Sequence, residues 1–216
     1  SSSKTLSTRW IYSSPLVLNL SFTKSGFFLM SSMSNIDLDF NRPCGKILGM
    51  VLVLLFVFVF QAFASDLYEE FVKEQVKNIP LDKAIVIGTG KEKLITFMNP
   101  DCPHCRKEWK ELKPHLKKVK LYVFLLPFKT MPESYPKSYY IACAKDKLKA
   151  FDEVLSGKFD GKPPKVKECP LVYEHIKVAE SLNIKGVPYN IVLKNYKVIE
   201  GYSPQLLKEL GINHGF

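Results

Sequence analysis

Arginine is scarce in the larger, C-terminal part of the sequence, although lysine is abundant there. The chain carries 31 Lys and Arg residues against 21 Asp and Glu, a formal charge of +10 at pH 7, yet Arg106 is the only arginine from Ser65 onward. Proteins that read nucleic acids use arginine forks on phosphates and bases as well as lysine charges. No compact basic run or recognition motif is present either. We therefore expect no nucleic-acid partner and interpret the lysines as a solvated surface.

The sequence also lacks a long apolar run that would span a membrane comfortably. Its longest apolar run, Ile47 to Phe60, has 14 residues, whereas a transmembrane helix needs about 20. The run follows Arg42 and Lys46 and precedes the small residues Ala62 and Ala64. This order is typical of a secretory signal peptide cleaved after Ala64. The alternative is an uncleaved membrane anchor, and both interpretations predict export of the rest.

Composition divides the chain into a leader, a signal region and one folded domain. The leader is rich in Ser and Thr without a clear period, and translation is expected to start at Met30 or Met33. We expect four parts: an unfolded leader at 1–46, the signal region at 47–64, a short helix at 65–81 and the domain at 82–216.

Cysteine is rare, with five residues in the chain. Cys44 precedes the predicted cleavage site and would leave with the signal peptide. The exported part then keeps Cys102, Cys105, Cys143 and Cys169. An even number of cysteines in an exported protein indicates disulfides, and two pairs are the simplest arrangement.

The apolar pattern from residue 82 onward predicts an α/β domain with a helical insertion. The expected order begins with a hairpin of strands 84–87 and 94–98, followed by a helix after Asp101 to about Lys118 with a kink at Pro114. A strand at 120–128 and a helical insertion at about 129–183 come next. The domain then ends with strands at 189–193 and 197–199 and a helix at 204–210.

The stretch NPDCPHCRKEW, residues 99–109, carries the chemistry. Cys102 and Cys105 lie three residues apart at a predicted helix start, so their sulfurs can approach bonding distance. Pro103 suits the first helical turn. The free N–H groups and positive dipole end of the helix favour a Cys102 thiolate, and a protonated His104 would add positive charge. Cys105, one turn deeper, would resolve a mixed disulfide.

Metal and haem sites are weaker interpretations of this stretch. Covalent haem needs a histidine directly after the second cysteine, and the chain has Arg106 there. A structural zinc site needs two more ligands, but no second C-x-x-C is present and neither His115 nor His175 has a companion at H-x-x-x-H spacing. A copper site on Cys102, Cys105 and a histidine stays open as an alternative. We expect neither a metal nor a cofactor.

A second motif, GVPYNIVL, begins at Gly186. A proline that opens a strand after Gly-Val is where thioredoxin-like folds place a cis proline beside their active cysteines. Such a proline, Pro188, would leave the backbone of Val187 to pair with an extended client peptide. The alternative is a trans proline at a strand edge.

By these stretches, residues 65–216 resemble the catalytic domain of the DsbC/DsbG thiol:disulfide interchange family. The similar segments are ITFMNPDCPHCRK, ACAKDKLKAFDEVLSGK and SLNIKGVPYNIVLKNYKVIEGYSP. The resemblance implies a thioredoxin-like fold, with Cys102 as nucleophile, Cys105 as resolving cysteine and Pro188 as the cis proline.

The same resemblance implies that Cys143 and Cys169 form a structural disulfide in the helical insertion. Family isomerases carry an upstream dimerisation domain, whereas about 17 residues, 65–81, precede the first strand here. We therefore expect a monomer. The dipeptide Pro103-His104 resembles that of DsbA oxidases rather than DsbC.

Two further residues depart from the family pattern. Val187 before the proline is similar to DsbA. Thr96 stands six residues before Cys102, where thioredoxins place a buried acid. Proton transfer to Cys105 would then need water or another group.

Together these observations predict a periplasmic thiol–disulfide oxidoreductase that acts on exported client proteins with cysteines. A membrane redox partner would recycle it. We favour an oxidase over an isomerase or a reductase of the same fold, including a reductase dedicated to cytochrome maturation. The alternative of another class is a periplasmic chaperone or metal carrier whose thiols are ligands or bystanders.

Overall fold

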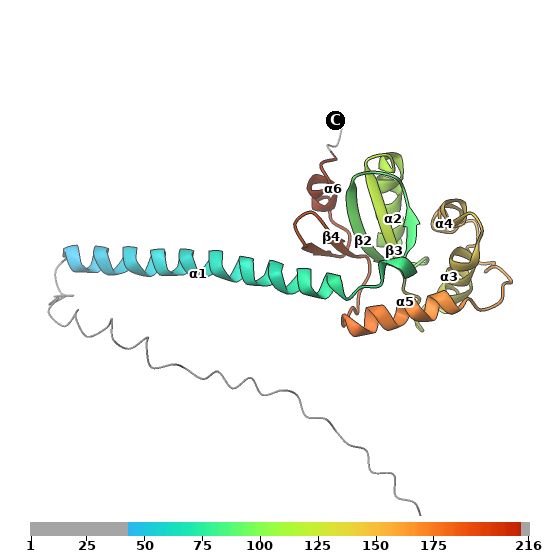
Figure 1. Cartoon of the computed structure of the whole chain (residues 1–216), viewed down its shortest axis with the longest axis horizontal. Coiled ribbons are helices and arrows are strands. Elements are labelled where there is room, and N and C mark those ends of the chain that lie inside the picture. The colour runs from blue at the N-terminus through green and yellow to red at the C-terminus, as the bar shows by residue number, and fades with distance from the viewer. Residues whose placement is uncertain (1–42, 213–216) are drawn as a thin grey trace, which may run out of the picture. The chain divides into compact units, whose positions relative to one another are not determined.

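The computed structural model describes residues 43–212 (Figure 1). The chain divides into two compact units, 1–56 and 57–216. The predictions for residues 1–42, including the leader and the start at Met30 or Met33, lie outside the described residues. The first unit is described only from Pro43, as the beginning of helix α1.

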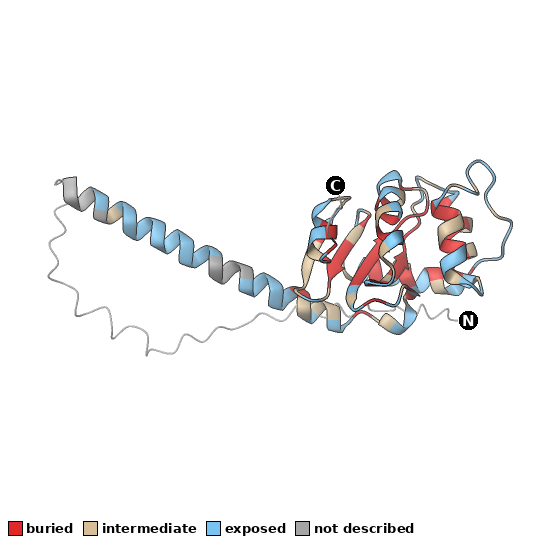
Figure 2. Ribbon diagram, turned by 90° about the horizontal axis from the view of Figure 1, so that it is seen from above, coloured by how far each residue is buried: buried red, intermediate tan, exposed pale blue. Residues whose placement is uncertain are grey.

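Helix α1, Pro43–Lys77, runs without a break through the predicted signal region and the predicted short helix. The predicted helix at 65–81 lies in the C-terminal part of α1 as far as Lys77, and no Gly or Pro between Met50 and Lys77 interrupts α1. Its apolar side chains from Met50 to Phe60 are exposed (Figure 2). Within the described chain, Gly49–Lys77 is the one helix long and apolar enough to cross a membrane, a test that a signal sequence also passes.

The described residues form a five-stranded sheet in the order β1-β3-β2-β4-β5. Strands β2 and β3 are parallel, and the other neighbours are antiparallel. The strands are β1 Ile85–Ile87, β2 Glu92–Met98, β3 Val119–Leu125, β4 Tyr189–Val192 and β5 Lys197–Glu200.

The predicted hairpin between the first two strands was wrong, because β1 and β2 both pair with β3 instead of with each other. Their connection packs against the chain just before β3: Thr89 N–H donates to Leu116 O at 2.9 Å, and Gly90 N–H donates to Val119 O at 3.3 Å. A Cβ on Gly90 would lie 1.8 Å from the backbone of Lys118. This close approach carries the chain past β3, so that β3 lies between β1 and β2 in the sheet.

Helices cover both faces of the sheet, as the continuous burial of β2 from Leu94 to Met98 requires, because successive side chains point to opposite faces. Leu94 and Met98 face the core shared with α2, α3, α4 and α6, whereas Ile95 and Phe97 face the core shared with α5 and the end of α1. The helices are α2 Pro103–Leu112, α3 Ser134–Cys143, α4 Lys147–Leu155, α5 Pro170–Ser181 and α6 Gln205–Glu209. The predicted α/β class with a helical insertion, which α3, α4 and α5 form, is confirmed.

Helix α2 is shorter than the predicted helix, which extended to about Lys118. It ends at Leu112 and continues as a 3₁₀ turn, Lys113–His115. Pro114 lies inside that turn, and its missing N–H and its ring prevent a further α-helical turn. The predicted kink is therefore a helix end.

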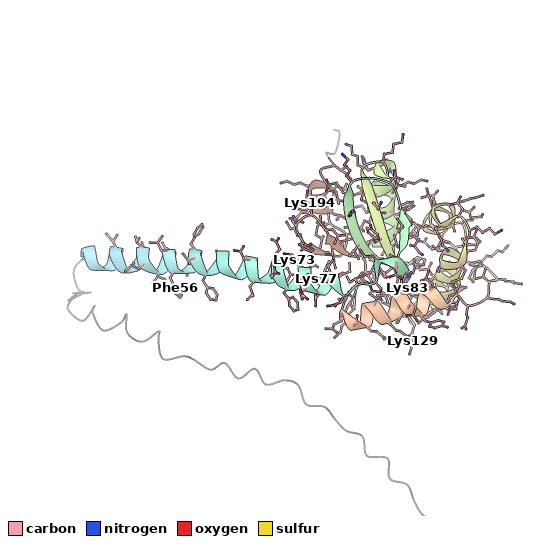
Figure 3. The ribbon with its side chains drawn as sticks, viewed as in Figure 1. Phe56, Lys73, Lys77, Lys83, Lys129 and Lys194 are labelled. Carbon is pink, nitrogen blue, oxygen red and sulfur yellow. A yellow bond between two sulfur atoms is a disulfide. The ribbon has the colours of Figure 1, made fainter. Side chains whose placement is uncertain are left out.

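Most lysines of the domain are solvated, as predicted from their scattered distribution. Lys83, Lys129 and Lys194, for example, are exposed (Figure 3). Lys137 is an exception, with 1% of its surface exposed, and it belongs to the charge cluster described below.

Candidate active site

The loop after β2 places both cysteines of the CPHC stretch at the beginning of α2. Asn99 holds this loop: its side-chain amide donates to Leu126 O at 3.1 Å, and its Oδ1 accepts from Asp101 N–H at 2.8 Å. Cys102 is the N-cap of α2 with an extended backbone, φ −76° and ψ 120°, and Pro103 occupies the first turn. Cys105 follows one turn later on the same face.

Both sulfurs are free thiols, and they differ in exposure. Cys102 is 7% exposed and Cys105 is fully buried. Pro103 and His104, which lie between them, are exposed. A partner molecule therefore has access to Cys102, while Cys105 is reached only through it.

The pKa of the Cys102 thiol is lowered from an ordinary 9.0 to about 6. The hydrogen bond from the Cys105 thiol is the largest cause, and burial opposes it. Backbone N–H groups of Cys105 and His104 at the helix start lower the pKa further, and the charge of His104 contributes least. The pKa of Cys105 is raised, chiefly because burial disfavours its thiolate. His104, which we predicted to tune Cys102 electrostatically, thus acts through its backbone more than its ring.

The start of strand β4 lies against the same sulfur. The peptide bond between Val187 and Pro188 is cis, the geometry implied by the family resemblance. The Cys102 thiol donates to Val187 O at 3.6 Å, across 85 residues of sequence. Pro188 is buried and Val187 is partly exposed. The backbone of Val187 and the sulfur of Cys102 therefore lie next to each other.

A buried polar cluster, which the sequence analysis missed, lies on the inner side of α2. It consists of Glu108, Asn190 and Thr96. Glu108 is 2% exposed and the other two are fully buried. The Asn190 amide donates to Glu108 Oε2 at 2.9 Å, and burial raises the pKa of Glu108 to about 8. The available signal was the spacing C-x-x-E, which puts Glu108 on the face of α2 that carries Cys105.

A second group, the Asp101 cluster, ties the active-site loop to the helical insertion. Asp101 and Arg106 belong to the loop and α2, whereas Lys137 lies on α3 and Asp160 follows α4. Arg106 donates to Pro100 O at 2.8 Å, to Asp101 at 3.0 Å and to both Asp160 oxygens at 2.7 Å. Lys137 donates to Asp101 Oδ1 at 2.5 Å. These bonds fix the backbone on either side of the two cysteines.

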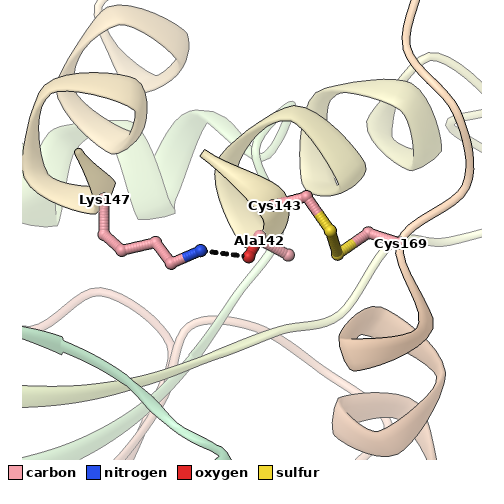
Figure 4. Close-up of a disulfide and its surroundings, with 4 residues drawn as sticks. All are labelled: Ala142, Cys143, Lys147 and Cys169. Carbon is pink, nitrogen blue, oxygen red and sulfur yellow. Dashed lines mark hydrogen bonds between the residues drawn. A yellow bond between two sulfur atoms is a disulfide. The ribbon is translucent and has the colours of Figure 1, made fainter. Parts of the chain in front are cut away.

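The other two cysteines form a disulfide in the insertion. Cys143, at the end of α3, joins Cys169, the N-cap of α5, with an S–S distance of 2.00 Å (Figure 4). Cys143 is exposed and Cys169 is buried. The Lys147 ammonium group donates to Ala142 O beside the bridge. The disulfide lies away from the CPHC stretch in the sequence and belongs to other helices.

Within residues 43–212, no group of three or more His, Cys, Asp and Glu side chains could hold a metal ion. The chemistry that the arrangement offers is that of its sulfurs. An acidic, partly accessible thiol lies one helical turn from a buried thiol of raised pKa. Such a pair can exchange disulfides with a third sulfur.

Comparison with known proteins gives the class. The thioredoxin-like domain family matches residues 79–209, and the chain belongs to this family. A probable thiol:disulfide interchange protein DsbC from Bordetella avium is 31% identical over 135 residues, which cover 61% of this chain and 47% of the relative. The chain thus spans about half the length of that curated relative.

Two solved structures share the fold. The disulfide interchange protein of Neisseria gonorrhoeae is 29% identical with a TM-score of 0.51, covering 62% of this chain and 96% of its own. Helicobacter pylori DsbG is 24% identical with a TM-score of 0.51, covering 70% of this chain and 72% of its own. The predicted thioredoxin-like fold is confirmed.

Proposed function

We propose that this protein is an exported thiol–disulfide oxidoreductase that exchanges disulfides with client proteins through Cys102 and Cys105. The observation that carries the proposal is the Cys102 thiol, whose pKa of about 6 makes it largely ionised at neutral pH. The thiolate is the reactive form in exchange. The names of the Bordetella and Neisseria relatives support the same chemistry.

In the proposed exchange, client oxidation begins with the Cys102–Cys105 disulfide. A client thiolate attacks Cys102 Sγ, a mixed disulfide forms, and Cys105 leaves as a thiolate that takes up a proton. A second client thiolate then attacks the client sulfur of the mixed disulfide and releases Cys102 as a thiolate. The client gains a disulfide, and both enzyme sulfurs are reduced. Client reduction is the same sequence in reverse, with Cys105 as the resolving nucleophile.

We favour the oxidase direction. A low pKa at Cys102 stabilises the reduced enzyme, and an enzyme whose reduced form is stabilised is a strong oxidant. The cis peptide bond before Pro188 leaves the backbone of Val187 beside Cys102, where an extended client segment could pair with it. Pro103, His104, Val187 and Pro188 thus shape the surface around the nucleophile.

The proposed location is the periplasm, with recycling by a membrane redox partner. The support is the exposed apolar α1, which is long enough for a signal or an anchor. The predicted monomer stays a prediction.

Trapping of mixed disulfides tests the function. The Cys105→Ala variant, produced with its native leader, should accumulate disulfide-linked adducts with exported proteins and with the recycling partner, because Cys102 can capture but not release them. The Cys102→Ser variant is the matched control and should form none. Equal adduct levels in the two variants, or refolding of clients at the wild-type rate by Cys102→Ser, would overturn the proposal in favour of a chaperone.

Direction and metal carriage need separate measurements. Thioredoxin has a reduction potential of about −270 mV. Titration of the cysteine pair against glutathione should give a potential well above that value. A potential near the thioredoxin value would indicate a reductase. Metal analysis of the purified protein should find less than stoichiometric zinc and copper, and a stoichiometric metal would support the carrier alternative.

A further inference from the structure

We propose that Glu108, held in place by Asn190, exchanges the proton of the Cys105 thiol during disulfide transfer. The inference rests on the proposed function and adds a catalytic residue to it. In the sequence, the position six residues before Cys102 carries Thr96, so the acid comes from α2 instead of the strand.

The geometry brings an acid to the buried side of the cysteine pair. Glu108 lies three residues after Cys105, on the same face of the same helix. Thr96 of β2 is the register partner of Asn190 of β4, so the two side chains point to the same face of the sheet. Because Asn190 reaches Glu108 with its amide, that face is the one covered by α2. Three buried polar side chains therefore lie between the sheet and α2, and one of them, Glu108, shares a helix face with Cys105.

The cluster leaves one carboxyl oxygen free for a proton. Asn190 occupies Glu108 Oε2, whereas Glu108 Oε1 and Thr96 Oγ1 have no hydrogen-bond partner among the described residues. Burial of an unpaired carboxylate is costly, and a protonated carboxyl avoids that cost.

Negative charge at Cys102 also influences whether the Glu108 carboxyl is protonated. The pKa of Glu108 is raised first by burial, then by the charges of Glu111 and of the Cys102 thiolate. The charges of Cys102 and Glu111 act on the Glu108 carboxyl, which in turn raises the pKa of Cys105 and of Tyr202. Strands β2 and β4 present the neutral Thr96 and Asn190. A mixed disulfide at Cys102 removes one negative charge, so the carboxyl ionises more readily in that intermediate.

The step balances without an added reagent. In the mixed disulfide, the Glu108 carboxylate takes the proton from Cys105 Sγ. The Cys105 thiolate attacks Cys102 Sγ, the bond from Cys102 to the partner sulfur breaks, and the partner leaves as a thiolate. The enzyme disulfide forms as the partner sulfur is reduced. In the reverse direction, protonated Glu108 returns the proton to the departing Cys105.

An aromatic disulfide separates the two steps in one experiment. With excess dithiobis(nitrobenzoate), reduced enzyme releases a first coloured thiolate when Cys102 attacks and a second when Cys105 resolves the mixed disulfide. The second phase is unimolecular, and because the leaving group is good, removal of the Cys105 proton should limit it. Stopped-flow traces are recorded from pH 5 to 9 for wild type, Glu108→Gln, Glu108→Asp and the control Glu111→Gln.

Glu108→Gln keeps the shape of the side chain and an acceptor for Asn190, so the fold should persist, which thermal unfolding checks. We expect its second phase to be slower than that of wild type by about 10- to 100-fold above pH 8. The wild-type rate should rise with pH as the Glu108 carboxyl ionises, and Glu108→Gln should lack this rise. The first phase should be unchanged. Glu108→Asp should recover part of the rate. Glu111→Gln should reach the wild-type rate at high pH, with the rise shifted to lower pH, because the charge of Glu111 raises the pKa of Glu108.

The outcomes distinguish the two proposals. If the second phase of Glu108→Gln has the wild-type rate at every pH, the role of Glu108 is overturned, while the exchange function stands. Equal slowing of both phases, or equal slowing by Glu111→Gln, would also overturn it in favour of a structural effect. Absence of the first phase in wild type would instead defeat the proposed function itself.

Discussion

Two helices of this protein begin in the same way, yet their first cysteines have different fates. Cys102 is the N-cap of α2 and Cys169 the N-cap of α5; both have an extended backbone, both are followed by a proline, and neither side chain caps its helix. Cys102 is a free thiol of low pKa, whereas Cys169 is locked in a disulfide.

The difference lies in where each partner sulfur comes from. Cys105 belongs to the same helix as Cys102 and is buried, so it can donate to the Cys102 sulfur and stay available as a thiol. Cys143 reaches Cys169 from the end of another helix, across 26 residues. A helix start thus favours a thiolate, but the partner decides whether the cysteine is reactive or structural.

The largest effect that tests this comparison is the acidity of Cys102. Alkylation of the reduced protein across pH 4.5 to 9 should show a midpoint of about 6 for Cys102, against the ordinary 9.0 after unfolding in urea. Because folding lowers the pKa of Cys102, this thiol stabilises the folded, reduced protein by up to about 4 kcal/mol. The full contribution is present above the unfolded pKa, and it is lost as the pH falls through 6.

The Cys105→Ala variant sharpens the test, because it removes the largest cause of the low pKa. Its midpoint should move upward toward the unfolded value. A midpoint that is equal in folded and unfolded protein would contradict the comparison altogether.

Removal of the second pair should change stability and leave chemistry alone. The Cys143→Ala, Cys169→Ala double variant should lose about 3 kcal/mol of unfolding free energy, measured in urea, since the open chain gains entropy. The two-phase exchange rates should stay within about twofold of wild type. A parallel fall in the Cys102 rate would show that the disulfide acts on the active helix.

A smaller effect is expected where the two regions meet. Lys137→Met removes the buried cation that binds Asp101 and leaves that carboxylate without one of its two partners. We expect a loss of about 2 kcal/mol in urea unfolding and slower alkylation of Cys102, because the loop before it loosens. Lys129→Met, at an exposed lysine, should change neither.

The smallest effect concerns the histidine between the active cysteines. His104→Ala keeps the backbone N–H groups and removes only the ring charge, the weakest of the influences on the Cys102 pKa. The pKa should rise, but by less than in Cys105→Ala, and alkylation at pH 5 should slow by about twofold. A larger shift than in Cys105→Ala would reverse the ranking of the two causes.

Prediction from sequence succeeded where the signal is local. The strands at β2, β3, β4 and β5 follow from apolar runs, and the start of α2 follows from Pro103 after an N-cap. The prediction of the strand that pairs with β1 failed, because Gly88 and Gly90 are equally compatible with a tight turn and with a close backbone crossing. Prediction from sequence also failed for the helix end before Pro114.

By itself, the sequence determined that two thiols share one face at a helix start, because three-residue spacing and a proline act within a single turn. The pairing of Cys143 with Cys169 rested on a family resemblance instead. Only the tertiary structure decided that Glu108 is buried. It lies within hydrogen-bond distance of Asn190, 82 residues further along the chain. Burial and long-range contacts arise from the packing of whole elements, and no local pattern encodes them.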